Sequence, residues 1–314
     1  MESKFSTQAL VFGTDLGFFQ MFKRFIIQQG IADVRTFVDP AEISQAISGN
    51  IWPIVFIDSS DDSAFDSLGF LDRFFATPGF ELLSFVAMGS SDAHHVMQFA
   101  RGVGARGGIL RPLQPSEAAK VISRVLPKTN DPVILLALAA SKLLLAGDFE
   151  RARVPLLKLA GNAVFEKCSE VALLRGEISL GICSRAEERL ARLLKRFPGD
   201  LRIYCEAANY FRHTTQHLMA LRFLREVEKT NALPHRSWER ACMALEIDDL
   251  DSAAVALDAL GKYPRHRQAA QMGFAQLLIS MGLQDHVPQV MKGCPTLAKR
   301  YSEYLQSELK AGKQ

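Results

Sequence analysis

The first 125 residues alternate short apolar runs with longer segments in which apolar residues recur every three or four positions. The short runs predict buried strands, and the longer segments predict amphipathic helices. The expected strands are Ala9–Phe12, Val34–Phe37, Ile54–Ile57, Leu83–Met88 and Gly108–Leu110. Five strand–helix units in succession predict an α/β fold, with a five-stranded parallel sheet that carries helices on both faces.

Beyond residue 132 the pattern is helical throughout and contains a repeat. Alanines recur at intervals of 34 residues near the starts of expected helices, at Ala152, Ala186, Ala220 and Ala254. Gly147 and Gly181 each precede one of these alanines by five residues. A small residue here lets paired helices pack closely, and the segment resembles the tetratricopeptide repeat, TPR, which has this period. The alternative is an α-helical bundle without repeats.

The sequence between the two patterns, Pro-Lys-Thr-Asn-Asp-Pro, is polar and bounded by prolines, as in a linker. We therefore predict a first domain over residues 1–126, a linker over 127–132, and a TPR α-solenoid over 133–314. The solenoid is expected to hold about five units, the last of them divergent. It would end in a capping helix over Ser302–Leu309, because open-ended stacks need such caps.

Four motifs of the first domain occur in an order typical of one family. They are Val55–Asp58, Ala87–Ser91, Gly102–Ala105 and Ile109–Leu113. With them the whole first domain resembles the CheY-like receiver domain of bacterial response regulators. The resemblance implies a flavodoxin-like sheet and a role in two-component phosphorelay signal transduction.

Asp58 stands where receiver domains carry the aspartate that accepts a phosphoryl group. The resemblance implies that Asp58 is the phosphoacceptor and that a histidine kinase is a partner. Its neighbours in the phosphate site would be Thr14, Asp15, Ser90 and Arg111. Ser90 would supply a hydroxyl group, and Arg111 replaces the lysine with which the family contacts the phosphate. Such fixed positive groups offset charge on the transferring oxygens.

Other positions depart from the receiver pattern. Gly13 and Thr14 stand where the family has the acidic pair that binds Mg²⁺, which leaves Asp15 and Asp58 as the candidate Mg²⁺ ligands. Gly108 replaces the aromatic residue that reports phosphorylation to the output surface. The domain is therefore either a switch phosphorylated at Asp58 or a docking module that keeps only the fold.

The solenoid predicts protein binding, because the first helix of each repeat presents a face to a concave groove. From the repeat register we expect that groove to contain Arg175, Arg202, Asn209, Arg212, His213 and Cys242. Several cationic or ionisable groups in one groove would suit an acidic protein partner. Another basic stretch, from Arg185 to Arg196, is expected to be a solvated outer helix face.

Composition and charge narrow the function further. The net charge of +3 divides into −3 over residues 1–125, with 10 Lys and Arg against 13 Asp and Glu, and +6 beyond. This bias is too mild for a nucleic-acid surface. No apolar run is long enough to span a membrane, and from the first residues we expect no signal peptide. The five cysteines form no Cys-x-x-Cys motif, so we expect free thiols in a reducing cytoplasm.

Three functional hypotheses remain. The first is a bacterial signalling adaptor that acts through protein–protein interaction, with a receiver-like domain phosphorylated at Asp58. The second is a phosphorylation-independent scaffold with a degenerate receiver domain. The third, a transcriptional or nucleic-acid-binding regulator, lacks a recognisable DNA-reading element. We expect no enzyme, because no catalytic Ser/His/Asp, Cys/His or metal constellation is recognisable in the sequence.

Overall fold

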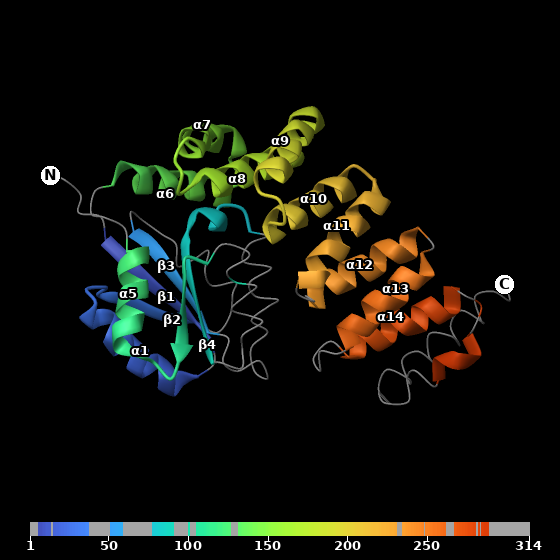
Figure 1. Cartoon of the computed structure of the whole chain (residues 1–314), viewed down its shortest axis with the longest axis horizontal. Coiled ribbons are helices and arrows are strands. Elements are labelled where there is room, and N and C mark those ends of the chain that lie inside the picture. Colours follow the sequence, from blue (N-terminus) through green and yellow to red (C-terminus); the bar gives the residue numbers. More distant parts are fainter. Residues whose placement is uncertain are drawn as a thin grey trace. The chain divides into compact units, whose positions relative to one another are not determined.

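The computed structural model describes residues 6–13, 15–37, 51–58, 77–90, 100, 105–126, 131–230, 234–247, 249–261, 267–280, 282 and 284–288. The chain divides into two compact units, Met1–Thr214 and Thr215–Gln314 (Figure 1). The expected capping helix over Ser302–Leu309 lies outside the described residues.

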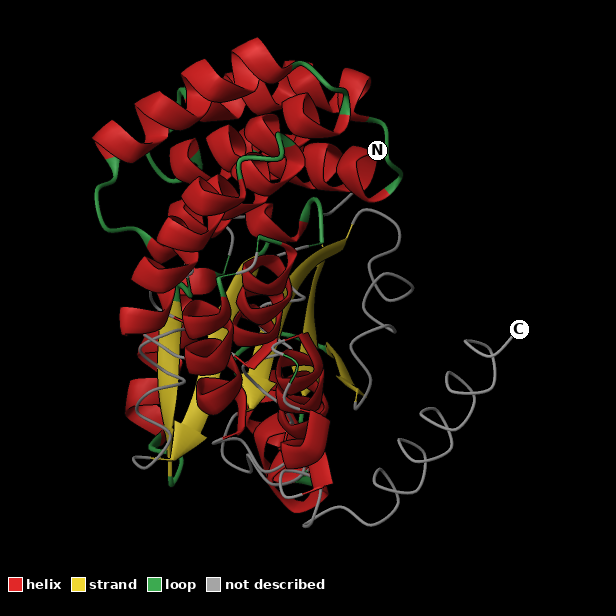
Figure 2. Ribbon diagram, turned by 90° about the vertical axis from the view of Figure 1, so that its right-hand side faces the viewer, coloured by secondary structure: helices red, strands yellow, loops and turns green. Residues whose placement is uncertain are grey.

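The first unit contains a five-stranded parallel sheet, as predicted (Figure 2). Its strands are β1 (Ser6–Phe12), β2 (Asp33–Phe37), β3 (Ile51–Asp58), β4 (Ser84–Ser90) and β5 (Gly107–Arg111). Their order is β2-β1-β3-β4-β5, which is the order of flavodoxin-like and CheY-like folds. The register pairs Asp58 with Met88 and Ser90 with Arg111, so the carboxyl ends of β3, β4 and β5 meet at one edge.

Helices α1 (Leu16–Gln28) and α5 (Pro115–Val125) contribute to the core of this sheet. The aromatic side chains of α1 recur at helical spacing, and Phe22 stacks on Phe18 with ring centroids 5.4 Å apart. Phe22 also meets Phe56 of β3 edge-on at 5.2 Å. Strand residues that point to the opposite face, such as Leu10 and Val55, are fully buried too. Both faces are therefore covered, as expected for a parallel sheet.

The rest of the first unit is a series of helices that pack in sequential pairs. They are α6 (Pro132–Leu145), α7 (Phe149–Ala160), α8 (Glu166–Ser179), α9 (Cys183–Arg196) and α10 (Leu201–His213). Gly147 and Gly181 have φ values of +74° and +70° in the turns that join α6 to α7 and α8 to α9. Glycine adopts this left-handed conformation without steric cost, which explains their place in the repeat. Ala152 and Ala186 are fully buried, so the repeat prediction is confirmed here.

The second unit continues the helical series with α11 (His217–Thr230), α12 (Pro234–Glu246), α13 (Leu250–Gly261) and α14 (Arg267–Ser280). In α11 the fully buried side chains Ala220, Leu224 and Val227 repeat the spacing of Ala186, Leu190 and Leu193 in α9. In α13 the same spacing falls on Ala253, Leu257 and Leu260. The repeat is therefore one residue short at this unit, and Ala254, which the 34-residue period predicts, is only partly buried.

This shift gives a testable difference between two adjacent alanines. We expect Ala253→Leu to lower the free energy of unfolding by about 1–3 kcal/mol, because Ala253 is 0% exposed and added carbons have no room. Ala254→Leu is the matched control and should cost less. Urea unfolding of both full-length variants measures the difference. A larger effect at Ala254 would contradict the register of the structure.

Sheet and helices of the first unit share one hydrophobic cluster. It joins Trp52 and Phe56 of β3 to Leu138 of α6 and Leu156 of α7. The connection is made by a short 3-10 helix, η2 (Phe80–Leu82), which precedes β4 and packs against α6 and α8. The division between the compact units thus falls within the helical series. The sequence boundary at residues 127–132 stays a prediction.

Candidate functional site

The predicted phosphate site is filled by an arginine. Asp58 ends β3 and is only 4% exposed. Arg111 ends β5, and its guanidinium makes an ion pair from Nη2 to Oδ2 of Asp58. Its Nη1 donates to Oδ2 of Asp15, the residue before α1, over 3.0 Å. In the sheet β4 lies between β3 and β5, and the long side chain of Arg111 reaches both carboxylates.

The guanidinium of Arg111 is held from a further side by an aromatic ring. Its Cζ lies 3.4 Å from the ring centroid of Phe18 on α1. A cation over an aromatic face is attracted by the quadrupole of the ring, and more strongly where water is excluded. Arg111 therefore joins β3, β5 and the start of α1, and its planar charge suits this better than a lysine would.

Asp15 uses both carboxylate oxygens in contacts of its own. Oδ1 accepts the backbone N–H of Phe18 at 2.9 Å, so Asp15 is the N-cap of α1, while Oδ2 accepts from Arg111. The N–H of Phe18 lowers the pKa of Asp15 below its ordinary value of 3.8, against an opposing effect of burial, and Arg111 lowers it further. The carboxylate thus remains charged and engaged.

This cap predicts a stability term that depends on pH. Because the pKa of Asp15 is lower in the folded protein, its contribution is fully present above about pH 4 and is lost as the pH falls through the folded value. We expect Asp15→Ala to cost about 1 kcal/mol at pH 7 and less at pH 3. Urea unfolding at both pH values tests this. An equal cost at both would show that the carboxylate charge is not what stabilises α1.

The residues present do not fit a Mg²⁺ ion. Gly13 has a φ of +154°, and a Cβ there would lie 2.6 Å from Cζ of Phe19 and 2.7 Å from Cβ of Asp58. An acidic side chain at this position would collide with Asp58. The two remaining carboxylates, Asp15 and Asp58, already share the cation of Arg111. Within the described residues, no group of three His, Cys, Asp or Glu side chains is placed to hold a metal.

Two other neighbours of the phosphate site were predicted, and one of them, Ser90, lies at this edge of the sheet. Ser90 ends β4, is partly buried, and pairs in register with Arg111, so its backbone lies beside the predicted phosphate position. Thr14 lies outside the described residues. Gly108 lies in β5, and no aromatic ring can report from this position.

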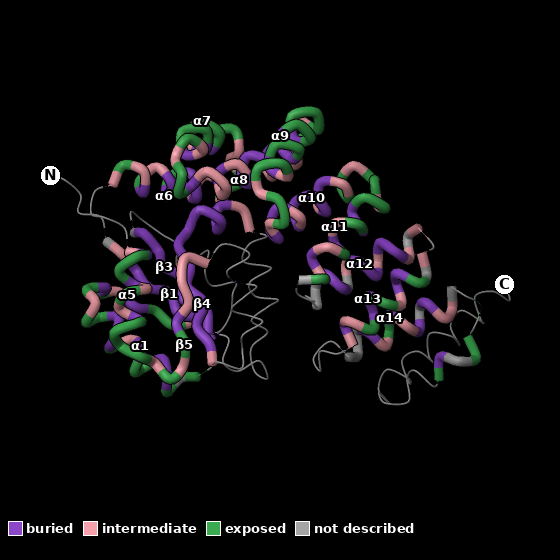
Figure 3. Tube along the Cα trace, viewed as in Figure 1, coloured by how far each residue is buried: buried purple, intermediate pink, exposed green. Residues whose placement is uncertain are grey.

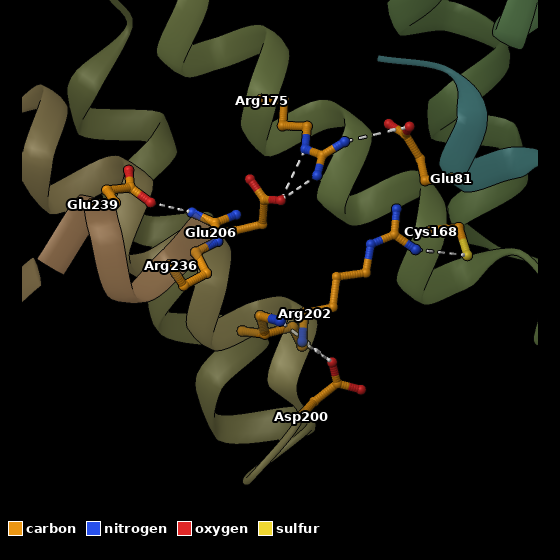
Figure 4. A network of polar contacts seen from close by, with 9 residues as sticks. Glu81, Cys168, Arg175, Asp200, Arg202, Glu206, Arg236 and Glu239 are labelled. Atoms are coloured by element: carbon orange, nitrogen blue, oxygen red, sulfur yellow. Dashed lines mark hydrogen bonds and ion pairs between the residues drawn. The ribbon is translucent and has the colours of Figure 1, made fainter. Parts of the chain in front are cut away.

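The predicted partner groove needs a correction, because two of its arginines are engaged within the chain (Figure 4). Arg175 of α8 donates from Nε to Oε1 of Glu206 on α10 over 2.9 Å, and Nη1 lies 3.5 Å from Oε2 of Glu81. Arg202 of α10 is 2% exposed, and its Nη1 lies 3.6 Å from Sγ of Cys168. Arg175 and Arg202 therefore do not line an open groove.

The other groove candidates differ in exposure. Arg212 and His213 are exposed at the end of α10, and Asn209 is partly buried. Cys242 of α12 belongs to the second unit and is also partly buried. Only Arg212 and His213 thus remain readily accessible to a partner in the described structure.

The sequence interpretation missed the residues that fill this face. Oγ of Ser141 on α6 donates to the carbonyl oxygen of Gly79 over 2.9 Å, and Glu81 of η2 reaches Arg175. These partners lie 62 and 94 residues apart in the chain. No local periodicity connects them, although the turn-forming Pro78-Gly79 pair before β4 marks an irregular segment.

Comparisons with known proteins give distant structural likenesses and no family. No family model and no curated protein matches the chain. MamA (residues 41 to the end) from Desulfovibrio magneticus RS-1 is a similar solved structure, with 14% identity, a TM-score of 0.46, and coverage of 55% of this chain and 97% of its own. Another, "MamA MSR-1 C2", has 15% identity, a TM-score of 0.43, and coverage of 54% and 98%.

A receiver domain is also among the similar structures. The N-terminal signal receiver domain of a two-component response regulator from Bacteroides fragilis has 13% identity and a TM-score of 0.34. The match covers 39% of this chain and 99% of that domain. Identities and scores this low transfer no activity or partner. Among the described residues, no helix has the length and apolar character needed to cross a membrane.

Proposed function

We propose that this protein is a protein-interaction adaptor whose receiver-like domain works without phosphorylation of Asp58. The observation that carries the proposal is the guanidinium of Arg111, bound between Asp58 and Asp15. The domain is then a pseudo-receiver, and the helical repeats are the surface that binds partner proteins. Its role would be to hold partners together in a reducing cytoplasm, where its free thiols stay reduced.

The chemistry of phosphoryl transfer supports this reading. An aspartate attacks a phosphoryl donor through a carboxylate oxygen, and a hard divalent cation offsets the charge that gathers on the phosphate oxygens. Here Oδ2 of Asp58 already accepts from Arg111, and the residues do not fit the metal. Arg111 supplies one positive charge in a fixed place and stabilises the unmodified carboxylate.

The way the sheet is attached supports the adaptor role. Segment η2 fixes the amino-terminal end of β4 to α6 and α8, whereas Asp58 lies at the opposite, carboxyl edge. The seven residues of β4 separate these edges by about 20 Å. In this structure the pseudo-receiver is thus attached to the helical array of the same unit through η2. For the carboxyl edge that holds Asp58 we propose a binding role and no catalysis.

A regulated version remains the second candidate, supported by Arg111 and Ser90. These residues lie beside each other at the ends of β5 and β4. After a movement of Arg111 away from Asp58, both would be near a phosphoryl group on that aspartate. In that case the protein would act in a phosphorelay with a histidine kinase as partner.

Acetyl phosphate distinguishes the two candidates. Full-length protein and the Asp58→Asn variant are incubated with acetyl phosphate and Mg²⁺, and intact mass spectrometry follows the product. We expect the natural protein to gain no phosphoryl group. The natural protein and the Asp58→Asn variant should also capture the same set of partner proteins. A gain of one phosphoryl group that Asp58→Asn abolishes would replace the adaptor proposal with the switch.

A further inference from the structure

Helices α6 and α8 are the first helices of the first two repeats, and a short segment of the chain itself covers one face of them. This segment, residues Gly79–Leu82, is here named the docked segment. Phe80 and Leu82 are buried, and the side chain of Glu81 is 0% exposed. The carbonyl oxygen of Gly79 accepts the buried hydrogen bond from Ser141 of α6. Backbone, apolar and charged groups of the segment are therefore all accommodated.

Glycine is required at the start of the docked segment. Gly79 has a φ of +93°, and a Cβ there would lie 2.6 Å from the backbone oxygen of Ser141 and 3.2 Å from Cβ of Leu144. The segment approaches α6 too closely for any side chain. Glu81 then directs its carboxylate to Arg175, which Glu206 orients from α10 (Figure 4).

We propose that this face is a recognition site for a short segment of the type glycine–aromatic–acidic–aliphatic, and that the docked segment is its built-in ligand. A partner protein with such a segment would bind by displacing residues 79–82. The inference rests on the proposed adaptor function and names its partner chemistry. A partner could then reach this face of the first two repeats only after the docked segment is released.

The fit of the docked segment is imperfect, which makes displacement feasible. Nη1 of Arg175 lies 3.5 Å from Oε2 of Glu81, at the long limit of a hydrogen bond, whereas its Nε lies 2.9 Å from Glu206. Oε1 of Glu81 is buried and has no hydrogen-bond partner in the described part of the chain. A buried acceptor without a partner is unfavourable, so a better-placed carboxylate would bind more tightly. The tether opposes this, because it supplies a local concentration of about millimolar.

The test uses a variant that opens the site and a control glycine with a similar positive φ. Gly79→Ala should expel the docked segment, because its methyl group meets α6. Gly30→Ala places an alanine at a similar φ of +91°, but no atom lies within 4 Å of the added carbon. A labelled peptide with the sequence of residues 77–83 is titrated against each full-length protein by fluorescence anisotropy. Hydrogen exchange of residues 77–83 reports whether the segment is released.

We expect the peptide to bind Gly79→Ala at least about tenfold more tightly than it binds Gly30→Ala or the natural protein. Adding Arg175→Ala to Gly79→Ala should weaken binding by about tenfold, because a charge-assisted bond is lost. Failure of the opened protein to bind, binding that ignores Arg175, or exchange as slow as in Gly30→Ala would each overturn the proposal.

Two further features keep the test decisive. If Gly79→Ala does not fold, Glu81→Lys opens the same site through repulsion by Arg175, and the same outcomes apply. Negative peptide results leave the acetyl phosphate experiment untouched, because that experiment reports on Asp58 at the other edge of the sheet. The two proposals can therefore fail separately.

Discussion

Arg111→Ala is expected to lower the free energy of unfolding of the sheet-containing unit by about 3–5 kcal/mol. The variant leaves the carboxylate of Asp58, which is almost completely buried, without its cation. It also removes the contact with the ring of Phe18 and the bond to Asp15. Urea unfolding followed by circular dichroism measures the loss.

An exposed ion pair of the same sheet provides the control. Arg35 lies 3.5 Å from Asp33, and both side chains are well exposed, so Arg35→Ala should cost no more than about 1 kcal/mol. Adding Asp58→Asn to Arg111→Ala should recover much of the loss, because the buried group is then neutral. If Arg111→Ala is as mild as Arg35→Ala, the Arg111–Asp58 pair does not hold this edge together.

The strands of the sheet could be predicted because each one is marked by its own stretch of sequence. Parallel strands buried on both faces are continuous apolar runs, and each expected strand overlaps an observed one. The pattern placed their ends less well: β3 begins at Ile51, three residues before the expected start. Trp52 and Pro53 interrupt the aliphatic run without leaving the strand, since its pairing with β1 continues through both.

The sequence predicted where the site lies, but only partly what its residues do. Asp58 and Arg111 end the two strands that flank β4, and the topology brings these ends to the same edge of the sheet. That Arg111 binds Asp58 directly depends on the distance between strand ends, which the sequence does not state. Asp15 had a readable signal, because an aspartate just before an apolar helix is a typical N-cap. The cap explains why its carboxylate is not free to bind a metal.

The groove shows the limit of repeat register. The register identifies the helix face on which Arg175 lies, but it cannot tell whether another segment covers that face. Glu81 comes from a segment far from the repeats in sequence, and its contact with Arg175 depends on how η2 packs against α8. Non-local contacts of this kind decide which predicted surfaces remain accessible.

Non-local contacts also distinguish two arginines of α9. The outer face of this helix is largely exposed (Figure 3). The sequence interpretation placed Arg189 and Arg192 together on a solvated face. Arg192 is exposed, whereas Arg189 is 8% exposed and donates from Nε and Nη2 to Glu177 of α8 over 2.8 and 2.9 Å. Its Nη1 also pairs with Glu170. Position 189 lies one turn after the buried Ala186, so helical spacing already favoured the inner face.

We expect Arg189→Ala to lower the free energy of unfolding by about 3–5 kcal/mol, because the carboxylate of Glu177 stays buried without its cation. Arg192→Ala, on the same helix, should change it by no more than about 0.5 kcal/mol. Urea unfolding compares the two full-length variants, and the difference should persist in 1 M NaCl because salt screens buried pairs weakly. Equal effects, or a difference that salt removes, would mean that Arg189 belongs to the solvated face after all. Replacing both partners, as in Glu177→Met with Arg189→Met, should regain much of the loss, because two apolar side chains leave no buried charge to compensate.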